Sequence, residues 1–476
     1  MTDTAGKTRV ERDSMGELEV PTDAYYGATT MRAVQNFPIR GPRLPRAMIR
    51  ALGLIKQSAA LVNADLGLLD RRLAEAVASA SQDVIDGRLD ADFPIDIFQT
   101  GSGTSSNMNA NEVISNRAIE LLGGERGTHT PVHPNDHVNL GQSSNDVFPS
   151  AIHVAAAMAV HEDLLPALVH LEAALRRQSD ATWAVVKTGR THLQDATPIR
   201  LGQEFLGFAG QVQRGRRRAE QALAELIELP LGGTAVGTGV NTHPEFARRV
   251  IARLADLSGL PLRETDNHFQ AQSTLDSAVT ASGSLRSVAV SLYEIAANIR
   301  LLGCGPRAGI AEIALPAVQP GSSIMPGKVN PVICESVTMV AARVVGNDAT
   351  IAFGGATGSL LELNVMMPVV AYALLESVDL LASSARNLAD RCVEGITATD
   401  NGPALVERGL MLGTALAPRI GYDAAAAMAK KAYATGRTVR EVAREVTDLS
   451  EEELTALLDP ERMTEPNLEN IGPAGG

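Results

Sequence analysis

The placement of proline is the feature that most limits what this chain can fold into. No proline occurs in the windows 167–197, 199–229, 262–305, 332–367 and 369–402. Proline interrupts a helix interior because it lacks the backbone N–H and its ring clashes with the preceding turn. These windows therefore leave room for long helices, and a helix of roughly thirty residues would run about 45 Å.

Hydrophobic spacing indicates a helix within the window 262–305. Apolar residues follow one another there at intervals of 3, 4, 3, 4 and 3: Leu285, Val288, Leu292, Ile295, Ile299 and Leu302. Such a seam is typical of a helix packed lengthwise against others, and it predicts core rather than chemistry. Ala and Leu favour helix, while aromatic residues, on which sandwiches and barrels depend, make up only 3% of the chain. No stretch alternates strand, glycine turn and helix over several units, so we expect an all-α fold.

Length and charge limit the class of protein further. A chain of 476 residues is too long for one hydrophobic core, so two or three domains are expected. The 42 Lys and Arg against 55 Asp and Glu give a net charge of −13. Such a chain is a poor electrostatic partner for nucleic acid or an anionic membrane. The polar N-terminal stretch has no apolar signal core, and the longest apolar run, Val365 to Leu375, contains Pro368 and is too short to cross a bilayer.

Cysteine usage indicates a reducing compartment. The three cysteines, Cys304, Cys334 and Cys392, stand far apart in the sequence and form no CxxC pair. They therefore suggest neither a disulfide framework nor a zinc signature. Together with the charge, they predict a soluble, cytoplasmic protein.

The two ends of the chain differ from its middle. Residues 1–46 hold several prolines and are expected to form an extended, irregular arm that leads into the first helices. After about residue 398 the helical patterns become shorter and more charged, and the chain ends in a Pro- and Gly-rich tail, Glu469 to Gly476. Residues 232–239 (GGTAVGTG) superficially resemble a nucleotide loop but lack the Walker lysine and a preceding β-branched strand. We interpret them as a turn between two long helices.

Four polar clusters lie between the helical windows. The first, Thr100 to Asn107, consists only of Gly, Ser, Thr and Asn and precedes a helical pattern over 108–122. Hydroxyls and free backbone N–H groups at a helix start can bind an anion, although an ordinary N-cap loop has the same composition.

The second cluster joins His133 to Asp136 with Gln142 to Asp146, again before a helical run. His129, His133 and His137 recur at every fourth position, which would suit a metal site on a helix. Pro131 and Pro134 break any helix there, so a polar loop is favoured over a metal site.

The third cluster, Gly189 to Pro198, holds His192 among hydroxyl and amide side chains at an expected helix junction. A structural hydrogen bond and a catalytic role are equally compatible with this histidine. The fourth cluster, Gly321 to Pro331, has two glycines and two prolines around Ser322, Ser323, Lys328 and Asn330, which suits a mobile loop with stiff joints. This density of polar groups in a chain of Ala, Leu and Val is not explained by packing.

Taken together, these segments resemble the fumarase/aspartase superfamily. GSSIMPGKVNP (321–331) matches the signature loop of that family, and further matches are FQTGSGTSSNMNANEV (98–113), VHPNDHVN (132–139), GQSSNDVFP (141–149), GRTHLQDATPI (189–199) and GGTAVGTGVN (232–241). The likeness is greatest to the class II fumarases, which need no iron. Aspartases tend to carry Ala in place of Gly327 and Thr in place of Ser144, and argininosuccinate and adenylosuccinate lyases have larger residues at the Gly327 position.

The resemblance implies an assembly as well as a fold. It implies a homotetramer around a core of long helices from four chains, with each active site shared between three subunits. The implied domains are an N-terminal domain (1–142), a central long-helix domain (143–397) and a small C-terminal helical domain (398–476). Neighbouring chains would solve the problem that the polar clusters sit at distant ends of rod-like elements.

The implied reaction is the reversible hydration of fumarate to (S)-malate, without a metal or another cofactor. A proton leaves C3 of malate before hydroxide leaves C2, so the dianionic aci-carboxylate between them is the costly species. By resemblance, Ser322 is the base and His192, steadied by Glu335, acts on the opposite face. The implied substrate-binding residues are Ser102, Gly103, Thr104, Ser143, Ser144, Asn145, Thr191, Ser323, Lys328, Val329 and Asn330.

Bacterial fumarases often have a second dicarboxylate site, which would fall on His133, Pro134, Asn135 and Asp136 here. The preceding stretch, Thr130 to Val132, lacks the usual Arg, so we expect this second site to be weak or unused. Two alternatives to the hydratase stay open. One is an ammonia-lyase acting on aspartate, and the other is a catalytically silent structural relative such as the superfamily members found in the lens.

Overall fold

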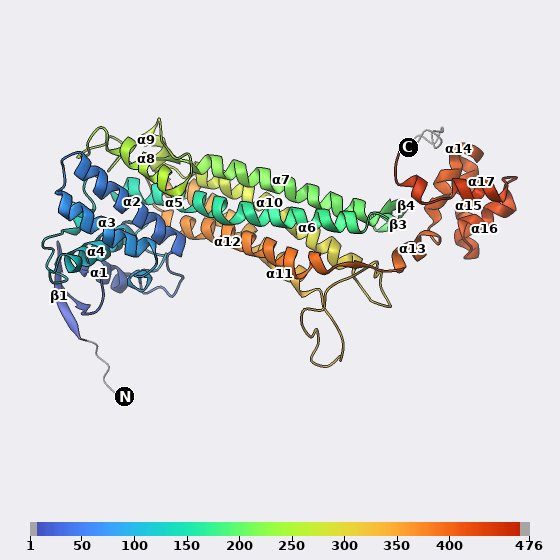
Figure 1. Cartoon of the computed structure of the whole chain (residues 1–476), viewed down its shortest axis with the longest axis horizontal. Coiled ribbons are helices and arrows are strands. Elements are labelled where there is room, and N and C mark those ends of the chain that lie inside the picture. The colour runs from blue at the N-terminus through green and yellow to red at the C-terminus, as the bar shows by residue number, and fades with distance from the viewer. Residues whose placement is uncertain (1–6, 467–476) are drawn as a thin grey trace. The chain divides into compact units, whose positions relative to one another are not determined.

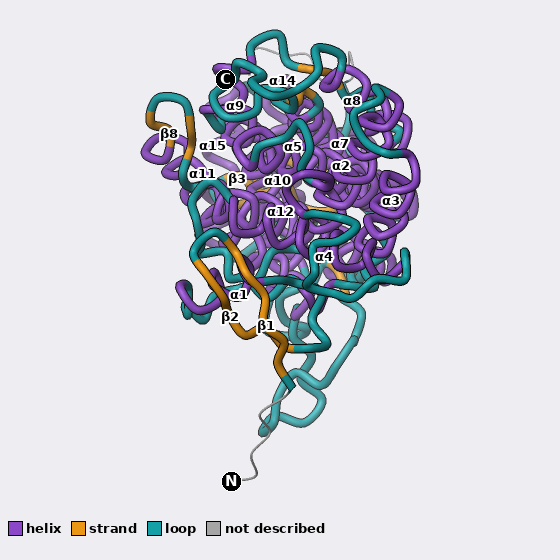
Figure 2. The backbone as a smooth tube through the Cα atoms, turned by 90° about the vertical axis from the view of Figure 1, so that its left-hand side faces the viewer, coloured by secondary structure: helices purple, strands orange, loops and turns teal. Residues whose placement is uncertain are grey.

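The computed structural model of the chain describes residues 7–466, and helices dominate it (Figures 1 and 2). The α-helices are α1 (Ala28–Asn36), α2 (Arg46–Asp65), α3 (Arg71–Ile85), α4 (Thr104–Leu121), α5 (Ser144–Ala159), α6 (Leu165–Ala181), α7 (Leu201–Leu226), α8 (Phe246–Ser258), α9 (His268–Ser273), α10 (Asp276–Leu302), α11 (Val332–Gly358), α12 (Met367–Arg391), α13 (Asn401–Val406), α14 (Ala417–Ile420), α15 (Tyr422–Thr435), α16 (Val439–Val446) and α17 (Glu451–Leu457). The predicted all-α fold is confirmed.

The strands are short and pair only two by two among the described residues. The pairs are β1 (Thr8–Asp13) with β2 (Gly16–Pro21), β3 (Val186–Thr191) with β4 (Gln194–Arg200), β5 (Glu228–Leu229) with β6 (Arg263–Glu264), β7 (Ile313–Ala314) with β10 (Thr397–Ala398), and β8 (Ser359–Leu360) with β9 (Leu363–Asn364). Only β5 and β6 run parallel. The first pair corrects one expectation, because part of the arm over 1–46 is a regular hairpin followed by α1.

The chain forms two compact units. The first unit comprises Met1–Pro166, Arg217–Ala289 and Ala341–Ala382, and the second comprises Ala167–Arg216, Val290–Val340 and Ser383–Gly476. The long helices α6, α7, α10, α11 and α12 contribute residues to both.

In the first unit, α2 is the central helix and packs against α3, α5 and α8. Its buried face is mostly apolar, and Lys56 is its one buried charged residue, beside the polar residues Ser58 and Asn63. Polar contacts join the helices of the bundle within this unit: Ser282 of α10 donates to Asp348 of α11 at 2.8 Å, and Asn347 of α11 donates to Glu376 of α12 at 2.8 Å. Such paired polar groups fix the register of helices whose contacts are otherwise apolar.

In the second unit, the β3–β4 hairpin packs against α13, and the short C-terminal helices enclose an apolar core of their own. That core includes Leu412, Leu416, Met428, Val442 and Leu458. The helices after residue 398 are short, as the sequence predicts, whereas the tail over 469–476 lies outside the described residues.

The predicted apolar seam is confirmed, since all six of its residues lie on α10 and are buried. The expectation that the longest apolar segment is too short to cross a bilayer needs a correction. Two helical stretches, Ser144–Ala181 and Met367–Gly395, are long and apolar enough to cross a membrane by length and composition. The structure buries 61% and 67% of their most apolar windows, as it does for the core helices of a bundle.

Candidate active site

The first polar cluster lies at the start of α4. Ser102 Oγ and Thr104 Oγ1 are 2.8 Å apart, and Gly103 between them occupies the N-cap position with φ of 72°. A Cβ atom at position 103 would lie 2.3 Å from the ring of Phe148 on α5. Glycine is therefore required both by the left-handed backbone and by the close approach of α5. The helix begins at Thr104, inside the polar cluster and four residues before the helical pattern predicted over 108–122.

The second cluster caps α5. Ser143 is the N-cap residue, and its backbone N–H donates to Asp146 Oδ1 at 2.9 Å in a capping box. The other Asp146 oxygen accepts the backbone N–H groups of Gly232 and Thr234 at 2.9 and 3.0 Å. Burial raises the pKa of Asp146, against these three backbone hydrogen bonds. The carboxyl thus ties the loop after β5 to the start of α5.

These segments meet in the first unit. Asn107 Nδ2 on α4 donates to Ser144 Oγ on α5 at 3.0 Å. Asn145 Nδ2 donates to the carbonyl of Ala235 at 2.9 Å. The structure therefore gathers Ser102, Thr104, Ser144 and Asn145 around two helix N-termini, where hydroxyl, amide and backbone donors suit a carboxylate. The loop over 232–239 connects α7 to the shorter α8, rather than two long helices.

The stretch His133 to Asp136 forms the start of a π-helical turn, Pro134–Val138. His133 Nδ1 accepts the backbone N–H groups of Asn135 and Asp136, both at 3.2 Å. These two backbone N–H groups are therefore engaged by the ring of His133. The expectation that a second dicarboxylate site at these residues is weak or unused stays a prediction.

The third cluster is a β-hairpin, which corrects the expected helix junction. Thr191 pairs with Gln194, and the two residues of the turn, His192 and Leu193, have φ of 56° and 58°. Two-residue turns of this hand usually carry Asn or Gly, because other residues lose about 1–2 kcal/mol each in the left-handed region. The turn nevertheless holds an exposed imidazole at its tip.

A buried ion cluster anchors this hairpin within the second unit. Arg190, next to Thr191, donates to both oxygens of Glu312 at 2.8 and 3.0 Å. Lys187 Nζ lies 3.0 Å from Glu312 and 2.8 Å from Glu204. Because Lys187 and Glu312 are almost fully buried, their charges are stable only while paired. The cluster thereby fixes the strand that carries Thr191 and His192.

The fourth cluster is a closed loop between β7 and α11. The backbone N–H of Gly321 donates to the carbonyl of Lys328 at 2.8 Å, and Asn330 Nδ2 donates to the carbonyl of Gly321 at 2.6 Å. Ser322 Oγ accepts the backbone N–H groups of Ile324 at 3.2 Å and Met325 at 2.9 Å. Two backbone N–H groups that donate to one oxygen would stabilise negative charge on it.

The remaining residues of this cluster lie around the loop. Ser323, Lys328 and Val329 are exposed, which leaves the Lys328 ammonium accessible to an anion. Glu335 lies in the first turn of α11, four residues after Pro331. Next to it, Cys334 Sγ lies 3.8 Å from Cys392 Sγ, a contact between free thiols that the sequence spacing does not indicate.

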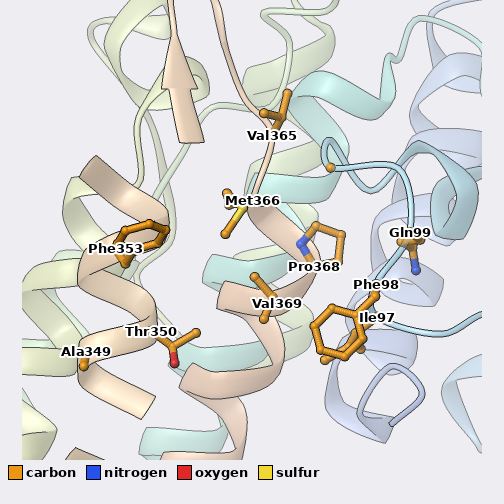
Figure 3. A pocket seen from close by; sticks show the side chains of 11 residues that line it. Ile97, Phe98, Gln99, Ala349, Thr350, Phe353, Val365, Met366, Pro368 and Val369 are labelled. Carbon is orange, nitrogen blue, oxygen red and sulfur yellow. The ribbon is translucent and has the colours of Figure 1, made fainter. Parts of the chain in front are cut away.

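An apolar hollow of about 500 Å³ lies next to the first cluster (Figure 3). Side chains of α11 and α12, among them Phe353 and Pro368, face Ile97 and Phe98 across it. Its lining carries no charged group, so it is unsuited to a dicarboxylate. The hydroxyl donors of α4 and α5 are better candidates for that role.

Sequence reasoning assigned no role to three residues that the structure places in or behind these clusters. They are Lys56 and Asn107, which contact the residues before and at the start of α5, and Glu312, which anchors the hairpin. For Lys56, a charged residue among the mostly apolar residues of this helix was the available signal. Glu312 follows its partners Lys187 and Arg190 by more than a hundred residues along the chain, and no local pattern marks it.

Comparison with known proteins identifies the class to which this fold and these donor clusters belong. Residues 16–346 match the lyase family, and residues 412–465 match the C-terminal region of fumarase C. These matches cover the α4, α5, β3–β4 and 321–331 segments as well as the C-terminal helices.

Individual relatives narrow this class further. The chain is 52% identical over 464 residues to a class II fumarate hydratase of Methylorubrum extorquens, covering 97% of this chain and 98% of that protein. It is 54% identical over 457 residues to a class II fumarate hydratase of Halobacterium salinarum, covering 96% and 97%. The crystal structure of a class II fumarase from Schistosoma mansoni superposes with a TM-score of 0.93 at 39% identity, covering 96% of this chain and 99% of that one. The chain therefore belongs to the class II fumarase family, within the fumarase/aspartase superfamily.

Proposed function

We propose that the chain is a fumarate hydratase that interconverts fumarate and (S)-malate. The observation that carries this proposal is the environment of Ser322, whose Oγ accepts two backbone N–H groups in a loop that also presents Lys328. A serine hydroxyl is a weak base unless its alkoxide is stabilised, and this loop supplies that stabilisation. The names of the relatives support the same reaction.

In the proposed mechanism, Ser322 removes the C3 proton of malate. Lys328 and Asn330 hold a substrate carboxylate while its charge develops toward the aci-carboxylate. The further donors are Ser102, Gly103, Thr104, Ser143, Ser144, Asn145, Thr191, Ser323 and Val329. His192 protonates the departing hydroxyl on the opposite face, and Glu335 steadies its charge.

We also propose the assembly that this mechanism needs. The donors come from α4 and α5, from the β3–β4 hairpin and from the loop over 321–331, which belong to different parts of the chain. A homotetramer with active sites shared between three subunits would bring them to one substrate. We retain the three domains 1–142, 143–397 and 398–476 for each subunit, and a cytoplasmic location on the basis of the acidic composition and the unpaired cysteines.

The loss of fumarate absorbance in the ultraviolet tests the reaction directly. Loss in plain buffer is the expected result. Loss only when ammonium is added would assign an ammonia-lyase instead, and no loss under either condition would assign a silent relative.

Two substitutions test the proposed acid and base. Ser322→Ala and His192→Asn should each lower turnover about 10²- to 10⁴-fold, the usual range for removing a general acid or base. Ser79→Ala, on the exposed surface of α3, and His170→Asn, whose ring is also exposed, are matched controls that should keep normal turnover. Near-normal turnover in Ser322→Ala or His192→Asn would remove that residue from the mechanism.

A further inference from the structure

Lys56 is a completely buried lysine that the proposed mechanism does not use. It lies on α2 between apolar residues such as Leu52, Ile55 and Ala59, and its side chain is 0% exposed. Its ammonium donates to Asn139 Oδ1 at 2.8 Å and to Gln142 Oε1 at 3.0 Å. Burial lowers the pKa of Lys56 from 10.5 to about 7, although Asp146 on α5 counteracts part of that effect.

The ammonium determines how the two neighbouring amides are oriented. A protonated lysine has three donors and no acceptor, so both amides must present oxygen to it. Their nitrogen atoms then face the backbone: Asn139 Nδ2 donates to the carbonyl of Gln142 at 3.1 Å, and Gln142 Nε2 donates to the carbonyls of Val138 and Leu140 at 3.1 and 3.2 Å. These bonds hold the turn that leads directly to Ser143.

Two further hydrogen bonds connect Asn139 to Ser144. Asn139 Oδ1 also accepts from Asn107 Nδ2 at 3.3 Å, and Asn107 Nδ2 donates to Ser144 Oγ at 3.0 Å. Because Ser144 Oγ accepts this bond, its own hydroxyl proton points elsewhere and is free to donate to an anion.

We propose that protonated Lys56 is a positioning residue that fixes the polarity of this hydrogen-bond chain and so presents the Ser144 hydroxyl to a substrate carboxylate. This inference rests on the proposed function of the α4 and α5 donors. A neutral amine can accept a hydrogen bond, which would allow either amide to exchange its oxygen and nitrogen and would break the sequence of donors toward Ser144.

The groups that face Lys56 from other elements are few. Asn139 and Gln142 of the turn present neutral amides to the ammonium, and Asn107 of α4 is connected to it through Asn139. Among the described residues, Asp146 of α5 is the charged group that acts on the pKa of Lys56, and its carboxyl is itself held by three backbone N–H groups. The charge of Lys56 therefore determines how the side-chain amides of this hydrogen-bond chain are oriented.

Lys56→Gln tests the proposal because it keeps a polar donor but removes the ammonium. We expect the KM for fumarate to rise about tenfold or more, with a smaller change in kcat, because the carboxylate is held in both the ground state and the transition state. Asn63→Ala is the matched control, since Asn63 lies on the same helix and donates to the carbonyl of Leu140 at 3.0 Å without a charge. Its KM should stay within about twofold of the wild-type value, even where its melting temperature falls.

A pH profile supplies a measurement that needs no stable variant at position 56. If binding requires the ammonium, the KM of the wild type should rise at least about fivefold between pH 7 and 8.5, because the fraction of charged Lys56 falls. Asn63→Ala should keep this rise, and Lys56→Gln should lack it. A flat wild-type profile, an unchanged KM in Lys56→Gln, or equal KM changes in both variants would overturn the proposal. Absence of fumarate hydration by the wild type would instead contradict the proposed function.

Discussion

Replacing Glu312 with glutamine removes the negative charge that faces two cations in the second unit. Arg190 donates to both oxygens of this carboxylate at 2.8 and 3.0 Å, and Lys187 Nζ lies 3.0 Å away. Glutamine has nearly the same shape as glutamate, so the substitution changes the charge and leaves the packing intact. The variant therefore isolates the contribution of the ion cluster to the hairpin that carries His192.

The structure gives the expected size of the effect. Removing one member of a buried ion pair costs about 3–5 kcal/mol, because the remaining charge is left without a partner. Lys187 keeps Glu204 at 2.8 Å, and Arg190 is partly exposed to water, so we expect the lower limit of about 3 kcal/mol. At about 2–4 °C per kcal/mol for a domain of 150–250 residues, the melting temperature should fall by about 6–12 °C.

Thermal unfolding followed by circular dichroism, at one protein concentration and one heating rate, measures this change. Glu294→Gln is the matched control, because Glu294 is exposed on α10 and accepts a bond from Gln211 at the surface. It should change the stability by less than about 0.5 kcal/mol. The reasoning fails if Glu312→Gln melts as the control does, since the buried charge of Glu312 would then contribute nothing to the stability.

Two further predictions concern the first unit. Gly103→Ala should destabilise the protein by about 2–5 kcal/mol and raise the KM, because the new Cβ would lie 2.3 Å from the Phe148 ring at a φ of 72°. Gly123→Ala is the control, because position 123 has a φ of 81° and no atom lies within 4 Å of the new Cβ. It should cost only about 1–2 kcal/mol in the same thermal assay. Burial by itself would raise the pKa of Glu120, but hydrogen bonds from three neighbours lower it from 4.5 to about 2: Tyr25, Arg126 and Arg117. Glu120→Gln should therefore melt below the wild type at pH 7, and the difference should shrink as the pH falls below about 4.5 and disappear as it falls through about 2. A difference at pH 2 as large as the one at pH 7 would contradict this linkage.

Local patterns in the sequence were sufficient for much of the fold. The seam from Leu285 to Leu302 predicted a buried helix face, because residues three and four apart share one side of a helix and the apolar side must leave water. The polar clusters at 100–107 and 142–146 contain the starts of α4 and α5, although the sequence placed both helices after the clusters. Unpaired N–H groups at a helix start require side-chain or backbone partners, which these clusters supply. By contrast, the proline map did not show that 186–200 forms a hairpin, because a window without proline permits a helix but does not require one.

The sequence by itself determined which chemical groups are present: hydroxyls, amides and one lysine. They occur between helices, in segments that match the class II fumarases. Tertiary structure alone decided that Asn107 donates to Ser144, that Lys56 lies behind the turn before Ser143, and that Glu312 meets Arg190 and Lys187. These partners are far apart in the sequence, and the burial that gives their charges and hydrogen bonds their strength exists only once the helices have packed.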